Sequence, residues 1–592
     1  MKDTLIKIKN VLKEHYLIIA LSFLLVFLIF APLLVFPYVI KNEYQGINFN
    51  RFGSDAHFYL TRGREVLDGH GLGDPLLKEG KDSRDIYSAY SEYILLAPIK
   101  LLGLAQKVNI TAVYNIYNFI GVFFLIILVY LLVLQLSGNK LLSAAAALFM
   151  IGGYSIVYNK ALFYSDFNVY ARVIYPYFSS LIMFAYLNLL VAGLKSAELK
   201  YKIFAGLAFG LLFYIYFYAW TFILALNVFL LLIYIAKKNF AAAKKVLFIG
   251  LLGLALGSYY LIGLLATLNS GHQASYFMMM SYGHKPIFSL IGFLTLILFA
   301  VFWYKRRDDK NMPFIFAIIL GGWFALNQQV ITGQMLQYGH YYWYFIVPLS
   351  IAISFYMIWR LITNKKLRKY LFLLLIAVVF LNTAGGQYKS FFANLEVKKY
   401  DQNFRPIIDA LNRDKSAGVI LAADGSDEYL FTIYTPHDLF WHSFALANLA
   451  PIDRAREALF VYFYFNNQAR NDFKNYLLKI IADQDQGFMY QYLFRNLEGY
   501  QSGLSFYDYG NKFSADDQSL AQNRAALIDQ LTKEYNEAVI KDGGINKILK
   551  KYGVNYIVWD KNKNPEWDLS FLGKNIREIA SSNNIYLYQL QP

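Results

Sequence analysis

The run LIIALSFLLVFLIFAPLLVFPYVI, residues 17–40, decides the fold class of this chain. It has 24 residues and no charge, which is long enough to cross the hydrocarbon core of a bilayer as a helix. Lys2, Lys7, Lys9 and Lys13 precede it. The run is too long for the apolar core of a signal peptide, and no small-residue cleavage site follows it. We therefore expect an uncleaved first transmembrane helix.

Composition extends this expectation to the whole chain. The 592 residues are 57% hydrophobic and only 16% charged, which is too apolar for a soluble protein of this length. The net charge of +16 lies in short basic clusters between apolar runs, a pattern typical of membrane topology and not of nucleic-acid binding. The absence of cysteine excludes disulfides, thiolate metal sites and a cysteine nucleophile.

Apolar runs of suitable length recur through the first 390 residues. They lie at 16–40, 112–136, 141–158, 174–194, 203–217, 219–236, 246–268, 287–304, 312–329, 341–360 and 370–386. The apolar stretch from Tyr93 to Leu104 is short and contains Pro98 and Lys100, so we interpret it as a juxtamembrane or half-embedded helix. The sequence predicts an α-helical polytopic membrane protein with about 11 transmembrane helices and a large first outer loop at 41–92.

Basic residues orient these spans. With eleven spans, 17 Lys and Arg residues fall in one set of loops, and the short loops of the other set hold only Lys160, Arg172 and Lys285. The positive-inside rule then places the N-terminus in the cytoplasm. It places the loops at 41–92, 159–173, 269–286 and 330–340, and the C-terminal region, outside the cytoplasm. We expect a multi-pass protein of the cytoplasmic (plasma) membrane.

The C-terminal region has a different character. No run beyond residue 390 is long enough to span a membrane, and charged residues are dense from Lys398 onward. Residues 419–423, 556–559 and 585–588 are typical of buried strands, whereas 523–552 has helical spacing. We expect a transmembrane domain over 1–390 and an extracytoplasmic α/β or α+β domain over 391–592.

An ionisable cluster follows the first span, in the segment GSDAHFYL at residues 53–60. Charge beside hydrocarbon is costly without a use, so this loop is the first place to look for chemistry. Ser54 or Asp55 could simply cap a helix start, because a short acceptor side chain satisfies free amide groups there. The N-cap and the catalytic interpretation of Asp55 are compatible if the carboxylate also faces a cavity.

The run from Asp55 to Leu60, with the later stretch REVLDG at 64–69, resembles the first extracytoplasmic loop of the GT-C superfamily of polyprenyl-phosphate-sugar-dependent glycosyltransferases. This group includes O-mannosyltransferases, aminoarabinose transferases and oligosaccharyltransferase catalytic subunits. Such enzymes begin the loop with Asp, often Asp-Glu, followed by aromatic residues and an Arg-Glu turn. The expected topology agrees over most of the chain, but Ala56 stands where the second acidic residue often occurs.

The resemblance implies an inverting hexosyl- or pentosyltransferase. It would move a sugar from a polyprenyl-phosphate or diphosphate carrier to a glycan, lipid or protein acceptor at the outer membrane face. Asp55 would be the catalytic carboxylate, acting as a general base within hydrogen-bond reach of the acceptor proton. Asp166 would be the acidic residue of the second outer loop, and it is the other catalytic candidate.

Other polar residues of the outer loops are candidates for substrate binding. Arg172 could grip a lipid-linked phosphate with two donor groups, or it could be an interfacial snorkelling arginine. Amides near 327–340 suit sugar hydroxyls, or they cap helices in an ordinary loop. The candidates are His57, Tyr59, Arg64, Arg172, His284, Lys285, Gln337 and His340. No cofactor is certain: Asp55, His57 and Asp166 could form a partial shell for Mg²⁺ or Mn²⁺, but no spacing fixes a metal.

Two other classes of function remain open from the sequence. A transporter or lipid flippase would have inverted repeats and charges near mid-membrane. The interiors of the predicted spans are almost free of charged residues, which favours the enzyme. A non-catalytic scaffold of the same fold stays open because Ala56 replaces the acidic partner.

Overall fold

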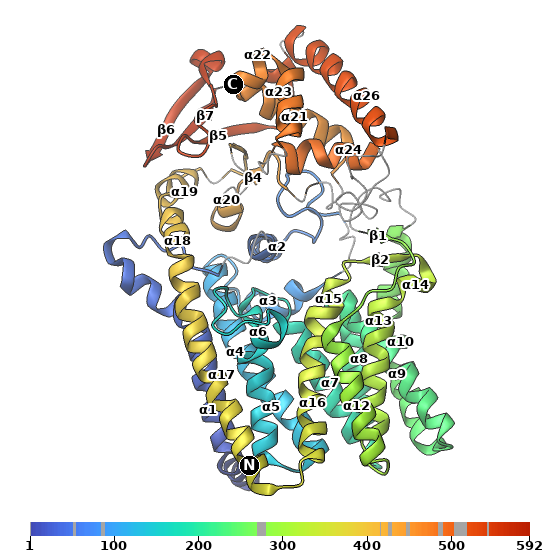
Figure 1. Cartoon of the computed structure of the whole chain (residues 1–592). Helices are drawn as coiled ribbons and strands as arrows, with labels where there is room; N and C mark the ends of the chain where they lie inside the picture. The colour runs from blue at the N-terminus through green and yellow to red at the C-terminus, as the bar shows by residue number, and fades with distance from the viewer. Residues whose placement is uncertain are drawn as a thin grey trace.

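The computed structural model places a helical bundle at one end of the molecule and a mixed α/β domain at the other (Figure 1). It describes residues 2–50, 55–83, 89–268, 280–414, 416–423, 429–443, 445, 450–483, 489–501, 518–541 and 544–591. The N-terminus lies at the end of the bundle away from the C-terminal domain. We call this the basal end, and the end that faces the domain the domain-facing end.

Each of the eleven predicted apolar runs falls on helical structure. The run at 141–158 covers α5 and the separate short α6 (Tyr154–Tyr158), and the run at 341–360 includes a π-helical turn (Tyr342–Ile346) before α16. Among the described residues, eight helices are long and apolar enough to cross a membrane, and α5 and α12 are shorter apolar helices. The polytopic helical fold is thus confirmed, and the count of eleven spans stays a prediction. The helices are α1 (Lys2–Ile40), α4 (Ile110–Ser137), α5 (Lys140–Gly152), α7 (Tyr177–Lys195), α8 (Leu199–Ile215), α9 (Phe217–Ala236), α10 (Phe240–Leu268), α12 (Leu290–Lys305), α13 (Met312–Asn327), α16 (Val347–Leu361) and α17 (Lys365–Ala393).

Short polar side chains define where these helices begin. The Asn109 side chain accepts hydrogen bonds from the backbone amides of Thr111 and Ala112 at the start of α4. Asn364 does the same for the first turn of α17. At the other end of α4, Gly138 adopts a left-handed conformation with φ 67°, which lets the chain turn directly into α5.

Glycines let α8 and α10 approach closely. A Cβ atom added at Gly206 would lie 2.6 Å from Leu252, and one added at Gly253 would lie 2.1 Å from Phe209. Small residues serve this purpose in membrane helices, because packing replaces the hydrophobic effect as the driving force for association.

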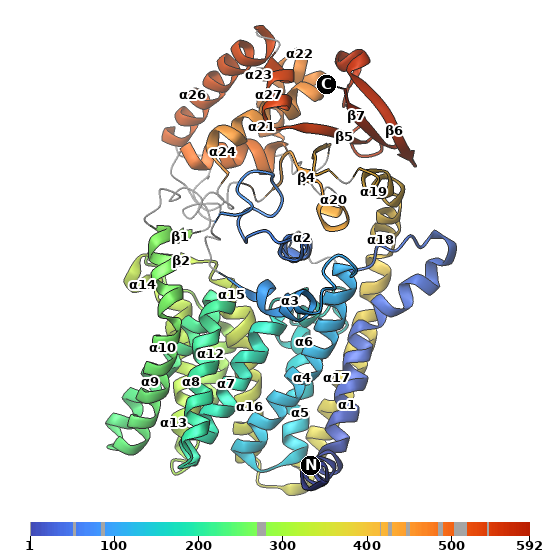
Figure 2. The ribbon, with the colours of Figure 1, turned by 180° about the vertical axis from the view of Figure 1, so that it is seen from behind.

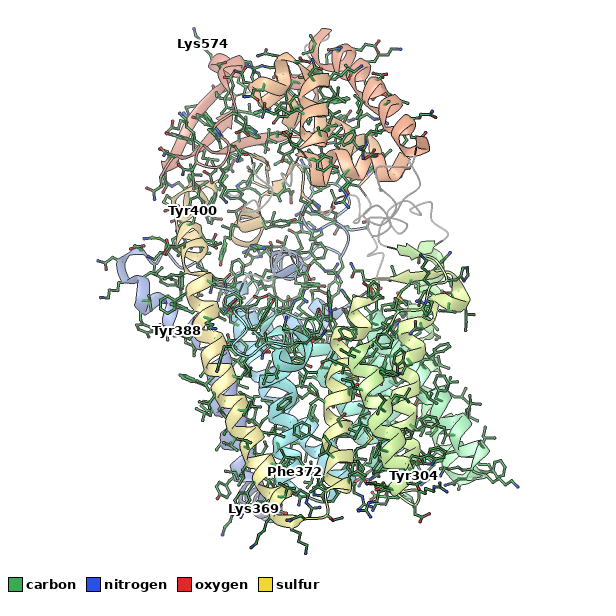
Figure 3. The ribbon with its side chains drawn as sticks, viewed as in Figure 1. Tyr304, Lys369, Phe372, Tyr388, Tyr400 and Lys574 are labelled. Carbon is green, nitrogen blue, oxygen red and sulfur yellow. The ribbon has the colours of Figure 1, made fainter. Side chains whose placement is uncertain are left out.

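The basic clusters of the sequence gather at the basal end of the bundle. Figure 3 shows Lys369 near the start of α17 and Tyr304 in the last turn of α12 at this end, whereas Lys574 lies at the far side of the C-terminal domain. This arrangement agrees with the charge bias from which a cytoplasmic basal end is predicted.

Short helices lie between the bundle and the C-terminal domain (Figure 2). They include α2 (Asp55–Asp68), α3 (Ser91–Leu101), α6 (Tyr154–Tyr158) and α15 (Gly339–Tyr341). The stretch predicted as a juxtamembrane helix at 93–104 corresponds to α3. Nearby, β1 (Met280–Tyr282) and β2 (Gln334–Leu336) form an antiparallel pair that joins the loops before α12 and α15.

The C-terminal domain is built on a mixed five-stranded sheet of order β4-β3-β5-β7-β6. The predicted strands at 419–423, 556–559 and 585–588 are confirmed by the central strands β3, β5 and β7. The strands are β3 (Val419–Ala422), β4 (Asp438–Leu439), β5 (Val554–Asp560), β6 (Ile576–Ser582) and β7 (Ile585–Leu590). Strand β6 was not predicted, because it is an edge strand whose polar residues lack a clear alternation of burial.

The helical spacing at 523–552 is confirmed, but this region is divided between two helices. The structure has α26 (Gln518–Tyr535), a π-helical turn (Asn536–Lys541) and a separate α27 (Gly544–Lys551). The sequence has Gly543-Gly544 at the start of α27, and glycine is roughly 1 kcal/mol per residue less favourable in a helix than alanine.

The first outer loop is part of the contact with the C-terminal domain. The backbone amide of Leu439 in β4 donates to the carbonyl of Leu76, at 2.7 Å. The buried His442 imidazole lies 3.1 Å from the Asp74 carboxylate. On α2, the Thr61 and Thr432 hydroxyls are 2.8 Å apart, which connects α2 to α20 (Tyr429–Tyr434). The first outer loop and α2 are therefore attached to the C-terminal domain. The domain boundary near residue 390 stays a prediction.

Candidate active site

The Asp55 carboxylate and the Arg172 guanidinium form an ion pair at the domain-facing end of the bundle. Asp55 is the first residue of α2, where a negative charge is favourable at the positive end of the helix dipole. Arg172 precedes α7, and its other terminal nitrogen donates to the Tyr344 hydroxyl. The Arg172 side chain is 14% exposed, whereas Asp55 is 45% exposed. The carboxylate is thus accessible, and its cationic partner is held in the protein.

The loop before α7 is fixed by asparagine side chains. The Asn118 amide of α4 donates to the carbonyl of Arg172. Asn168 accepts from the amide of Tyr170 and donates to the carbonyl of Ile151, both at 2.9 Å. These bonds close the short 3₁₀ turn Val169–Ala171 and leave the guanidinium pointing toward Asp55. The amide pattern of the loop thereby determines the position of its one arginine.

Aromatic rings form a continuous wall beside this pair. The ring of Tyr59 lies 5.2 Å from that of Tyr175, which stacks on Tyr216 at 4.3 Å. The Tyr216 hydroxyl is 2.6 Å from Nδ1 of His340, and the His340 ring is 5.4 Å from that of Tyr344. Burial, and next the nearby Asp55 charge, raise the pKa of Tyr59 well above its ordinary value, so its hydroxyl stays neutral. The wall brings together four separate segments of the chain.

Asp166 borders a hollow of about 320 Å³ that opens beside the same loop. Its carboxylate accepts from the amide of Phe167 at 2.7 Å. Burial raises the pKa of Asp166, while the Phe167 amide and the Arg172 charge oppose the shift. The two catalytic candidates therefore both lie in the field of Arg172. Aromatic and amide side chains complete the lining, among them Tyr154, Tyr158, Asn159, Trp343, Asn382 and Gln387.

Two candidates from the first loop point elsewhere on α2. The His57 side chain is buried, and its ring lies 5.1 Å from Phe49 and 5.4 Å from Tyr429 of α20. Arg64 pairs with Asp68 at 2.7 Å, one turn further along the same helix. The His57 contacts join α2 to its surroundings, and the Arg64–Asp68 pair lies within α2 itself.

The remaining candidates lie around β1 and β2. Nδ1 of His284 is 3.1 Å from the carbonyl of Val330, and the carbonyl of Lys285 accepts from the Gln329 side chain at 3.0 Å. The carbonyl of Gln337 accepts from the amide of His340 at 3.0 Å. Of this group, His340 reaches the aromatic wall, while His284, Lys285 and Gln337 shape the neighbouring loops.

The residues proposed as a metal shell do not form one in the described part of the chain. No group of three or more His, Asp or Glu side chains there could hold a metal ion. Asp55 is engaged by Arg172, and His57 faces Phe49 and Tyr429. The donor set therefore does not fit Mg²⁺ or Mn²⁺, and the mechanism proposed below uses no metal.

Several residues of the site were missed by sequence reasoning. Tyr175, Tyr216 and Tyr344 lie at the ends of apolar runs in a chain with 50 tyrosines, so no local signal separates them from ordinary interfacial tyrosines. The buried ion pair of Arg62 with Glu92, 2.7 Å apart, was also missed. It joins α2 to α3 and is a sign that α2 is rigidly placed, because a buried cation needs its partner.

The sequence matches no protein-family model, and no curated protein matches it significantly. Among solved structures, ArnT from Cupriavidus metallidurans, bound to undecaprenyl phosphate, aligns with 95% of this chain and 97% of its own, at 10% identity and a TM-score of 0.46. An Archaeoglobus fulgidus oligosaccharyltransferase in complex with Zn and sulfate aligns with 92% of this chain and 68% of its own, at 11% identity and a TM-score of 0.45.

A third structure is that of the archaeal oligosaccharyltransferase AglB from Archaeoglobus fulgidus, with an inhibitory peptide and a dolichol-phosphate. It aligns with 96% of this chain and 73% of its own, at 11% identity and a TM-score of 0.44. By its own architecture, the chain is a multi-pass helical membrane protein with a mixed α/β domain at one end of its bundle and an accessible carboxylate between the two.

Proposed function

We propose that this protein is an inverting membrane glycosyltransferase that takes a sugar from a polyprenyl-phosphate or diphosphate carrier. The observation that carries the proposal is the exposed Asp55 carboxylate, paired with the nearly buried Arg172 where the helical bundle meets the C-terminal domain. The resemblance of the Asp55 loop to that of GT-C enzymes supports it. This location would let a lipid-linked donor reach the site laterally through the bilayer, while the acceptor arrives from the aqueous side.

In the proposed reaction, Asp55 takes the proton of an acceptor hydroxyl. The acceptor oxygen then attacks the anomeric carbon from the face opposite the carrier. The bond between that carbon and the phosphate oxygen breaks, and the electron pair leaves with the phosphate. Because phosphate is a good leaving group, one base together with a cationic phosphate site is sufficient.

Arg172 suits the role of the phosphate site. Its two terminal nitrogens contact Asp55 and Tyr344, so both arms of the planar fork lie at the candidate site. An arginine binds phosphate through two parallel hydrogen bonds. A phosphate that binds Arg172 would compete with Asp55 for the guanidinium donors, and this would release the carboxylate to meet the acceptor hydroxyl. The Tyr344 hydroxyl would add a third donor.

We assign the sugar to the aromatic wall and to the hollow beside Asp166. Tyr59 and Tyr175 offer ring faces, and Asp166 offers a hydrogen-bond acceptor among amides. His340 would orient the Tyr216 hydroxyl. His284, Lys285 and Gln337 would contact the carrier from the β1 and β2 side, and His57 and Arg64 would act through the placement of α2. These assignments rest on the proposed reaction.

The test measures sugar transfer by purified protein in lipid, with a panel of polyprenyl-phosphate and polyprenyl-diphosphate donors. Asp55→Asn should lower kcat by roughly 10²–10⁴-fold while donor binding persists, because the variant removes the base and keeps the shape. Asp68→Asn is the matched control, since Asp68 lies on the same helix and, among the described residues, contacts Arg64 and Gln106 and not Arg172.

Equal turnover in the wild type and Asp55→Asn would remove Asp55 from the mechanism. If none of the donors supports turnover, the result would instead favour a transporter or a non-catalytic scaffold of this fold. Arg172→Lys provides a second check, because lysine keeps the charge but loses the bidentate geometry. We expect it to raise KM for the donor more than it lowers kcat.

A further inference from the structure

A polar cavity opens at the basal end of the bundle, opposite the candidate active site. Its volume is about 530 Å³. It lies between the basal ends of α4, α7 and α9 and the connection from α12 to α13. Figure 3 marks this end of the molecule by Tyr304, in the last turn of α12. The active-site chemistry makes no use of this cavity.

The lining of the cavity carries an excess of positive charge. Its basic residues are Lys195, Lys237, Arg307 and Lys310, and its acidic residues are Asp308 and Asp309. The Lys195 ammonium donates to the carbonyl of Gln135, and it lies close enough to Lys310 for the two charges to repel. Cations that converge on one hollow raise its potential for anions.

Asp309 does not neutralise these cations, because its carboxylate is used elsewhere. It accepts from Nε of Arg360 at 2.7 Å and from the Tyr356 hydroxyl at 2.9 Å, and the Asp309 side chain is 2% exposed. Asp308 is therefore the only acidic side chain of the lining that is free of this buried network. Four basic residues thus face a single available carboxylate.

The buried apolar part of the lining forms what we call the floor of the cavity. The Asn311 amide donates to the carbonyl of Leu136 and to the Tyr356 hydroxyl, both at 2.9 Å. Leu136, Val191 and Phe314 line the floor and are buried. A basic rim around an apolar floor suits an amphipathic anion, whose phosphate meets the cations while its glycerol and first methylenes meet the floor.

We propose that this cavity binds the phosphate group of an anionic phospholipid from the leaflet at the basal end. The positive-inside rule and the favourable effect of cations at helix C-termini account for basic residues at this end. Neither requires that they converge on one hollow without matching carboxylates. A free phosphate shares the recognised chemistry, and the experiment separates the two sources. The inference does not depend on the glycosyltransferase proposal.

The test compares two triple variants with equal loss of charge. Lys237→Gln, Arg307→Gln and Lys310→Gln remove cavity cations, and they leave the Lys195 bond to α4 in place. Lys365→Gln, Lys366→Gln and Lys369→Gln are the control, because these exposed lysines begin α17 at the same end and do not line the cavity. Native mass spectrometry of each protein in detergent follows titration with phosphatidylglycerol, phosphatidylcholine or inorganic phosphate.

We expect wild type and the α17 control to bind phosphatidylglycerol on the order of tenfold to a hundredfold more tightly than the cavity variant, since each basic residue near the headgroup adds to the affinity. Phosphatidylcholine should show no such difference. If the binding of inorganic phosphate, and not that of the lipid, depends on the cavity cations, the cavity recognises phosphate and its ligand is the free anion.

Equal phosphatidylglycerol binding by all three proteins, with no cavity-dependent binding of phosphate, would overturn the proposal. An equal loss in both triple variants would also overturn it, because diffuse surface charge would then explain the binding. Should the cavity triple variant fail to fold, Lys310→Gln alone replaces it. The single change should weaken binding several-fold, and an unchanged affinity would contradict the site.

Discussion

Lys81 connects the helix of the candidate active site to the C-terminal domain. Its Nζ lies 2.8 Å from Oε1 of Glu65 on α2 and 2.5 Å from Oδ1 of Asp438 on β4. The exposed fractions of the three side chains are 12%, 8% and 4%. Burial raises the pKa of both carboxyl groups, and Lys81 opposes the shift. Burial lowers the pKa of Lys81, but the two carboxylates outweigh it and leave that pKa raised.

Replacement of Lys81 by Met should destabilise this contact strongly at neutral pH. Removal of one partner of a buried ion pair costs about 3–5 kcal/mol, because the other charge stays buried without compensation. Here two carboxylates lose the same cation. We therefore expect Lys81→Met to lower the free energy of unfolding by about 3–5 kcal/mol near pH 8. Sugar transfer should fall as well, since α2 carries Asp55.

The loss should be smaller at pH 5. A carboxyl group whose pKa is raised in the folded state makes its full contribution to stability only below its ordinary pKa, which is 4.5 for Glu65 and 3.8 for Asp438. That contribution is lost as the pH rises through the folded-state pKa. Without Lys81 both folded-state pKa values rise further, so protonation at pH 5 relieves more of the penalty. In the wild type, the contribution of Lys81 persists up to its ordinary pKa of 10.5 and is lost above it.

Thermal unfolding of purified wild type and Lys81→Met at pH 5 and pH 8 checks this reasoning. Lys78→Met is the matched control, because Lys78 is an exposed lysine of the same loop. Addition of Asp438→Asn to Lys81→Met should recover part of the stability at pH 8, since it removes one buried charge. An equal Tm decrease at both pH values, or the same decrease in Lys78→Met, would refute the argument.

Three further outcomes follow from the packing and the site. Gly253→Ala should destabilise the protein by about 1–3 kcal/mol, because its Cβ would lie 2.1 Å from Phe209, whereas Gly250→Ala, with no atom within 4 Å, should leave Tm unchanged. Tyr344→Phe removes a hydrogen bond to the Arg172 guanidinium, and such bonds contribute about 1.5–3 kcal/mol, so the variant should lower both Tm and transfer activity; equal kcat/KM would contradict its role. Arg62→Gln should lower the free energy of unfolding by about 3–5 kcal/mol, measured by chemical denaturation, because it leaves the buried Glu92 carboxylate of α3 without its cation. A denaturation midpoint equal to that of wild type would show that the ion pair does not stabilise the protein.

The amino-acid sequence by itself determined the class of the molecule. The length and apolarity of a run such as 17–40 are local properties, so each predicted span falls on helical structure. The central strands at 419–423 and 585–588 were readable for the same reason, because a buried strand is a short apolar run between polar segments. The motif after the first span also singled out Asp55, since an acidic residue beside a membrane helix is unusual enough to stand out.

Only the tertiary structure decided which charges meet. Asp55, Arg172 and Tyr344 come from three segments that lie far apart along the chain, and the pairing depends on how α2 and the segments that flank α7 and α16 pack. Lys81 likewise reaches Glu65 and Asp438 only because the first loop lies against β4. The hydrophobic pattern of a sequence indicates whether a residue is buried. It does not indicate which distant residue packs against it, because many different partners would bury it equally well. Composition therefore settled the membrane class, and packing settled the site.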